Sequence, residues 1–124
     1  MANRRFNDVQ ALNREVKLIA GRVSIGASGA ATLADGLGIA SVAKDATGEY
    51  VVTLDDLYTG LLHCSASYVQ LAGSDTLFAQ IESHSVTVNK TVEIHLVNDA
   101  GSKTEPANGD EFTFFLMLRN SSVE

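Results

Sequence analysis

The segment Glu111-Phe112-Thr113-Phe114-Phe115-Leu116-Met117-Leu118-Arg119 decides the fold class of this chain. Successive side chains of a β-strand point to opposite faces, so one face of this segment would carry Phe112, Phe114, Leu116 and Leu118. The other face would carry Phe115 and Met117, and a strand that is apolar on both faces has to be covered on both. The second cover would be another subunit or an amino-terminal helix. The candidates for the core and for a subunit contact are therefore Phe112, Phe114, Phe115, Met117 and Leu118.

Other β-prone segments lie upstream of this strand and are separated by turn signals. Alternating or β-branched runs occupy residues 22–25, 39–44, 49–54, 63–71, 77–84 and 91–97. About seven short strands at a spacing of roughly ten residues are typical of a sandwich. The sequence thus predicts a mainly β chain, with a β-sandwich or jelly-roll-like domain and a short N-terminal helix or arm. The Gly- and Ala-rich stretch 26–38 is interpreted as an ordered loop or arm.

Residues 7–20 carry the helical pattern of the chain. Apolar side chains recur there at spacings of three and four, at Val9, Leu12, Val16 and Ile19. Asn7 or Asp8 can cap the first turn, and Gly21 would end the helix or act as a hinge into a strand. We therefore divide the chain into a basic N-terminal helix or arm, 1–22, and a single β-sandwich domain, 23–124.

The charges are distributed unevenly along the chain. The net charge is −6, yet residues 1–22 hold five basic side chains against two acidic ones. A basic arm on an acidic body suggests docking on an acidic partner, such as a neighbouring copy; the alternative is a solvated helix face that happens to be basic. The docking candidates are Arg4, Arg5, Phe6, Arg14 and Lys17. Nucleic acid is not expected as a partner, because the acidic body would repel phosphates and no aromatic residues alternate with the bases.

Cys64 is the single cysteine and lies in an apolar setting, so we expect a buried, inert thiol and no disulfide. The first residues have no apolar run after their charges, which argues against a secretory signal. No apolar run reaches the length of a membrane span. We therefore expect a soluble chain that is made in a cytosol and does not bind membranes.

A search for catalytic residues gives little. Asp55-Asp56 suits capping better than glycoside hydrolysis, and no nucleophile elbow of the Gly-x-Ser-x-Gly type is present. If Asn89-Lys90 formed a two-residue turn, His84 and His95 would face each other and could share a metal ion. This pair is a weak metal candidate, because the sequence offers no further ligands at a zinc-site spacing. We expect no enzyme and no cofactor; a metal-assisted hydrolase is the least favoured hypothesis.

Several segments resemble small virion proteins of tailed bacteriophages, of the decoration or cement type that bind the outside of the capsid. The resemblance rests on 5–12, which begins Arg-Phe-Asn-Asp, on 15–21, and on 38–44 with 48–54, and it ends with 118–123. The family implies a homotrimer that binds the major capsid protein on the virion surface and bridges neighbouring capsid subunits. It provides no catalytic residues.

One alternative belongs to a different class of function. The chain could be a head-fibre or tail component that binds a carbohydrate or receptor through loops 26–38 and 98–110. Exposed tyrosine or tryptophan platforms would favour this alternative. The chain has no tryptophan, and its tyrosines lie in or beside expected strands.

Overall fold

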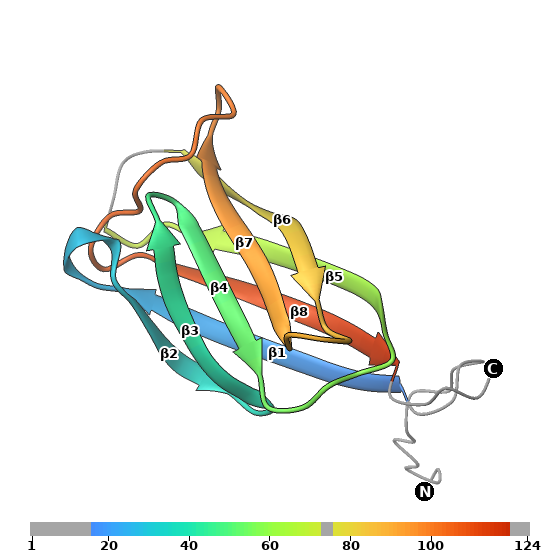
Figure 1. The fold of residues 1–124 in the computed structure, drawn as a ribbon. Helices are drawn as coiled ribbons and strands as arrows, with labels where there is room; N and C mark the ends of the chain where they lie inside the picture. Colours follow the sequence, from blue (N-terminus) through green and yellow to red (C-terminus); the bar gives the residue numbers. More distant parts are fainter. Residues whose placement is uncertain (1–15, 73–75, 120–124) are drawn as a thin grey trace, which may run out of the picture.

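The computed structural model describes residues 16–72 and 76–119, which form a sandwich of two four-stranded antiparallel sheets (Figure 1). The first sheet has the order β2-β1-β8-β5, and the second has the order β3-β4-β7-β6. The expected mainly β fold and the sandwich are therefore confirmed. The elements are β1 (Val16–Ile25), the 3-10 turn η1 (Ala27–Gly29), β2 (Ala31–Gly36), β3 (Ile39–Ala46), β4 (Glu49–Leu54), β5 (Gly60–Val69), β6 (Leu77–Ser85), β7 (Thr91–Asn98) and β8 (Glu111–Arg119).

The two sheets lie over each other with matching edges. β5 packs against β6 at one edge, and β2 packs against β3 at the other. β8 lies in the interior of the first sheet, between β1 and β5, although it is the last strand in the sequence. Its inner face is therefore covered by the second sheet of the same chain.

The core confirms the alternation expected in β8. Phe112, Phe114, Leu116 and Leu118 are all buried between the sheets, where they meet side chains such as Tyr50 of β4. The Tyr50 and Phe112 rings are 5.2 Å apart between centroids and tilted by 52°. Phe115 and Met117 lie on the opposite, outer face and are half-buried. Of the five candidates for core or contact, three thus form the core and two remain on the outside.

The expected helix over residues 7–20 is wrong for its last five residues, which belong to strand β1. Residues 7–15 lie outside the described part of the chain. β1 pairs with β8 from Val16 opposite Arg119 to Ser24 opposite Glu111, and this long-range pairing overrides a local helical spacing. Gly21 caps no helix, because it lies inside β1 opposite Phe114, where a Cβ would come within 2.5 Å of Cζ of that ring. The division between residues 22 and 23 falls inside β1, so residues 16–22 are part of the sandwich.

The stretch 26–38 is a turn and an edge strand, and the interpretation as a loop or arm was incomplete. Ala31–Gly36 pairs with β1, with a bulge between Arg22 and Val23. β2 lies at the edge of its sheet, and most of its side chains are exposed. Such an edge strand lacks the apolar alternation by which a strand is recognised in a sequence.

The two-residue turn at Asn89-Lys90 is wrong as well. β6 ends at Ser85 opposite Thr91, so the connection is five residues long, and its Val86 is fully buried. The backbone amides of Asn89 and Lys90 both donate to the Ser85 carbonyl. The connection is longer than the expected two-residue turn, so each pair between β6 and β7 differs from the expected pair.

Alkaline pH is expected to destabilise the fold through its tyrosines. Burial raises the pKa of Tyr50 and of Tyr68 above the usual value of 10.0, and the carboxylates of Glu105 and Asp110 raise them further. Each folded-state pKa lies above the unfolded one, so this contribution to stability is complete below pH 10 and is lost as pH rises above it. Urea unfolding at pH 8, 10 and 11 measures the decline in the free energy of unfolding. The Tyr50→Phe/Tyr68→Phe variant should show a smaller decline; an equal decline would contradict this assignment.

Candidate functional site

One end of the sandwich gathers the loops and the ends of the terminal strands, and we call it the terminal end. β1 begins there and β8 ends there, at the lower right of Figure 1. Backbone hydrogen bonds join the three loops of this end to each other and to β8: Asp55 to the Gly38 carbonyl, Tyr58 to the Val86 carbonyl and Thr59 to the Arg119 carbonyl, at 2.8–3.0 Å. The terminal end is therefore one continuous surface made of loops 37–38, 55–59 and 86–90.

Large apolar side chains are exposed at the terminal end. Leu37 is 89% exposed and Val88 is 72% exposed, and Leu57 lies in the loop between them in sequence. Leu18 of β1 and Leu62 of β5 are also exposed, near the starts of their strands. Single exposed apolar residues are common on soluble proteins, whereas a group of them marks a contact surface.

The outer face of the first sheet carries further apolar side chains beside Leu18. Met117 lies between Leu18 of β1 and His63 of β5, and Phe115 lies one pair farther along, beside Ala20. No side chain of the second sheet can reach this face, because the second sheet packs on the opposite one. Within residues 16–72 and 76–119, Phe115 and Met117 thus face away from the core, unlike Phe112, Phe114 and Leu118.

The basic docking candidates are placed only in part. Lys17 is exposed and lies opposite Leu118, next to the pair of Val16 and Arg119 where β1 begins and β8 ends. It therefore lies at the terminal end. Arg4, Arg5, Phe6 and Arg14 lie outside the described residues. Cys64 is half-buried against the core, and burial raises the pKa of its thiol, which agrees with an unreactive cysteine.

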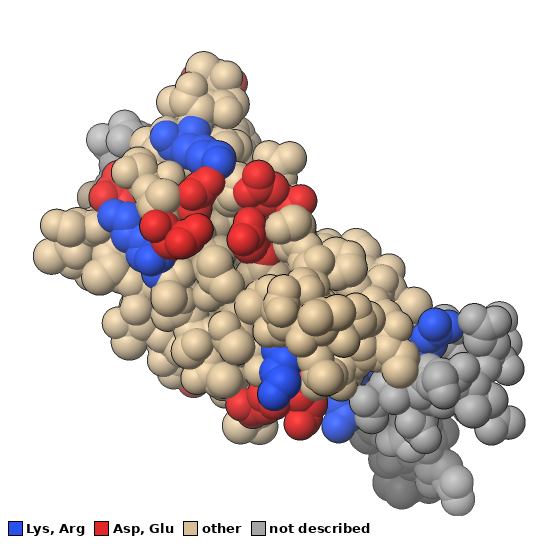
Figure 2. Space-filling view, viewed as in Figure 1, with Lys and Arg blue, Asp and Glu red and all other residues tan. Residues whose placement is uncertain are grey.

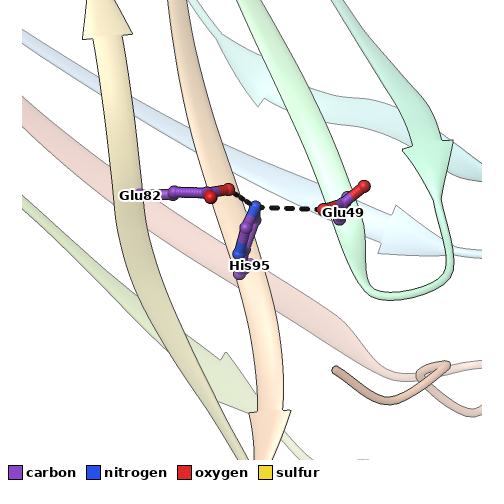
Figure 3. A group of neighbouring side chains, drawn as sticks. All are labelled: Glu49, Glu82 and His95. Atoms are coloured by element: carbon purple, nitrogen blue, oxygen red, sulfur yellow. Dashed lines mark ion pairs between the residues drawn. The ribbon is translucent and has the colours of Figure 1, made fainter. Parts of the chain in front are cut away.

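A second group of functional side chains lies on the outer face of the second sheet. His95 of β7 lies between Glu82 of β6 and Glu49 of β4 (Figure 3). His95 Nε2 is 3.5 Å from Glu49 Oε1 and also contacts Glu82 Oε2. The imidazole is only 8% exposed, because the two carboxylates and the neighbouring strands cover it. We call Glu49, Glu82 and His95 the His95 cluster.

A β-bulge explains how Glu82 reaches His95. His95 is directly opposite Gln80, and the register shifts between Ile81 and Ser83, so Glu82 is the extra residue of β6. Such a bulge changes the direction of a side chain without ending the strand. The expected pair of His84 and His95 is wrong because the connection between β6 and β7 is five residues long: His84 lies opposite Val92 and is exposed. A bulge has no signature in this sequence, so Glu82 could not have been chosen in advance.

The electrostatic surroundings of the His95 cluster are acidic, with one lysine. Figure 2 shows acidic side chains gathered on the upper half of the visible face, with basic ones beside them. Lys103 forms an ion pair with Glu49. This hydrogen bond lowers the pKa of Glu49, and the charge of His95 lowers it further. In return, Glu49 raises the pKa of Lys103, with smaller contributions from Glu82 and Glu93. The cluster is therefore a place where positive charge is stabilised.

Comparison of the chain with protein-family models, with curated proteins and with solved structures finds no match. Among residues 16–72 and 76–119, no helix is long and apolar enough to cross a membrane. The two candidate surfaces are thus the apolar terminal end with the adjoining outer face, and the His95 cluster.

Proposed function

We propose that this chain is a structural virion protein, a capsid decoration protein that binds the outer shell as an oligomer and bridges neighbouring capsid subunits. The observation that carries the proposal is the exposed apolar surface formed by the terminal end and the outer face around Met117. A surface of this kind is suited to contact with another protein and offers no arrangement for a reaction. The proposed role in the shell requires neither a reaction nor a cofactor.

The apolar surface and the basic residues have separate tasks in this proposal. The outer face around Leu18, Phe115 and Met117 joins subunits into a trimer. The exposed Lys17 and the basic residues before β1 dock on the acidic surface of the major capsid protein. Three weak contacts in one trimer act at a high effective concentration, so each contact can be small while the whole particle binds tightly.

Self-association tests the role of the outer face. Leu18→Lys places a charge in the proposed subunit contact, while Leu71→Lys makes the same change at an even more exposed leucine away from it. In sedimentation velocity runs, the wild type and Leu71→Lys should form the same oligomer, and Leu18→Lys should dissociate at least tenfold more readily, which corresponds to about 1.4 kcal/mol. A wild type that stays monomeric at every concentration would contradict the proposal.

Co-sedimentation with empty capsid shells tests the docking role. Removal of residues 1–15 deletes Arg4, Arg5 and Arg14 and keeps all of β1, so the sandwich should remain folded. The truncated protein should keep its oligomeric state and lose most of its shell binding, and added salt should weaken the binding of the full chain. Full decoration by the truncated protein would rule out docking through this segment.

The receptor-binding alternative stays a prediction. One of the two loops that would bind the receptor, 26–38, contains strand β2. The tyrosines form no exposed platform, because Tyr50 and Tyr58 are buried and Tyr68 is half-buried against the core. No observation favours it over the decoration function.

A further inference from the structure

We propose that the His95 cluster binds a divalent transition-metal ion, with Zn²⁺ as the best match. The three side chains offer one imidazole nitrogen and two carboxylate oxygens, and these ligand atoms all lie within 4.8 Å of one another. Zinc is commonly held by histidine and carboxylate ligands at about 2.0–2.2 Å. Two ligands of a tetrahedral ion at those distances are roughly 3.3–3.6 Å apart. The distance of 3.5 Å between His95 Nε2 and Glu49 Oε1 fits this spacing, whereas Glu82 Oε2 lies closer to Nε2 than two ligands of one ion can, so the Glu82 side chain has to draw back when the ion binds.

The fold brings the three ligand residues together before any ion binds. Glu49 and His95 are directly paired residues of β4 and β7, and Glu82 is fixed by the bulge of β6. All three side chains thus come from adjacent strands of one sheet, as Figure 3 shows. A site on paired strands loses little conformational entropy when it closes on an ion.

The choice of metal follows from the nitrogen ligand. Ca²⁺ and Mg²⁺ prefer sites made of oxygen atoms only, whereas imidazole suits zinc and its neighbours among the transition metals. Three protein ligands leave one position of a tetrahedral ion open to water or to a partner's side chain. The site would therefore bind zinc in preference to magnesium.

Lys103 is the competitor for this site. Its ammonium group pairs with Glu49 and also feels the charges of Glu82 and Glu93. An ion that binds between the carboxylates has to displace Lys103 from Glu49. Removing this lysine should consequently tighten zinc binding, which a general loss of structure would not do.

Calorimetric titration of the untagged full-length protein with ZnCl₂ tests the proposal. The wild type should bind one zinc ion per chain and show no heat with MgCl₂. Glu82→Gln should weaken zinc binding at least tenfold, and Lys103→Met should tighten it at least threefold. His84→Ala, a change at an exposed histidine two residues from Glu82, should leave binding unchanged. Thermal unfolding gives a second measurement, with a melting temperature raised by roughly 10 °C at a hundredfold excess of zinc over Kd.

Any of three results would overturn the proposal. The first is the absence of saturable zinc binding by the wild type up to about 1 mM zinc, where even a weak site would be filled. The second is equal loss of binding in His84→Ala and Glu82→Gln. The third is weaker binding in Lys103→Met. Glu82 and Lys103 are well exposed, so both variants should fold, and circular dichroism checks that they do.

Discussion

Gly48→Ala is expected to lower the free energy of unfolding by about 4 kcal/mol, because strain and a steric clash occur together. Gly48 has a φ of +69°, which other residues adopt only with strain. A Cβ at this position would also lie 2.8 Å from the Leu96 carbonyl oxygen and 2.9 Å from the Thr104 amide nitrogen. Both atoms are backbone, so neither can move without displacing β7 or the segment after it.

Gly101→Ala is the matched control for the change at Gly48. Gly101 also has a positive φ, of +83°, but no atom lies within 4 Å of the position of a Cβ. Its replacement should lower the free energy of unfolding by the backbone strain alone, about 1 kcal/mol. Urea unfolding followed by circular dichroism measures both variants. Equal losses at the two glycines would mean that backbone strain alone determines the effect and that the close approach to Leu96 and Thr104 does not matter.

The second large effect is expected at Asp110, which is 1% exposed and accepts hydrogen bonds through both carboxylate oxygens. Its carboxylate binds the Tyr68 hydroxyl and the backbone amides of Leu71 and Ala72, the latter two at 2.8 and 2.7 Å. Asp110→Ala leaves these donors without their acceptor and should cost about 4–5 kcal/mol. Asp110→Asn keeps one acceptor oxygen and should cost about half as much.

Asp99→Ala serves as the control for Asp110, because Asp99 is exposed in a turn and its loss should cost no more than about 0.5 kcal/mol. A double-mutant cycle with Tyr68→Phe separates the contribution of the hydroxyl from that of the two amides. The two single changes should not be additive, since they remove the same hydrogen bond. Strict additivity would show that the Tyr68–Asp110 contact contributes nothing to the stability of the fold.

The sequence predicted the fold class because the evidence for it is local. The alternation in Glu111–Arg119 shows directly which side chains face the core, and the structure buries Phe112, Phe114 and Leu118 accordingly. Strands β3 and β4 were also recognised, because the β-prone runs 39–44 and 49–54 are separated by a turn signal, in which Gly48 has a positive φ. In these segments, an alternation with a period of two and a turn residue suffice to assign the strands, independently of the rest of the chain.

Site residues could be predicted from the sequence only where they belong to the alternating pattern of a single strand. Phe115 and Met117 were chosen from the parity of β8, and both lie on the outer face of the first sheet. The His95 cluster was missed, since Glu49, Glu82 and His95 come from three strands and their meeting depends on the pairing between those strands. The sequence singled out His95 but combined it with the wrong partner, His84.

By itself, the sequence determined that the chain is mainly β, with a sandwich or jelly-roll-like domain, and which side of its last strand faces inward. The tertiary structure alone decided that residues 16–20 extend a strand, that Val86 is drawn into the core, and that Glu82 is turned toward His95 by a bulge. The physical reason is that side-chain direction follows from the local period, whereas strand register is fixed by backbone hydrogen bonds between distant segments. A shift of one residue in that register changes every neighbour across the sheet, and no local pattern records it.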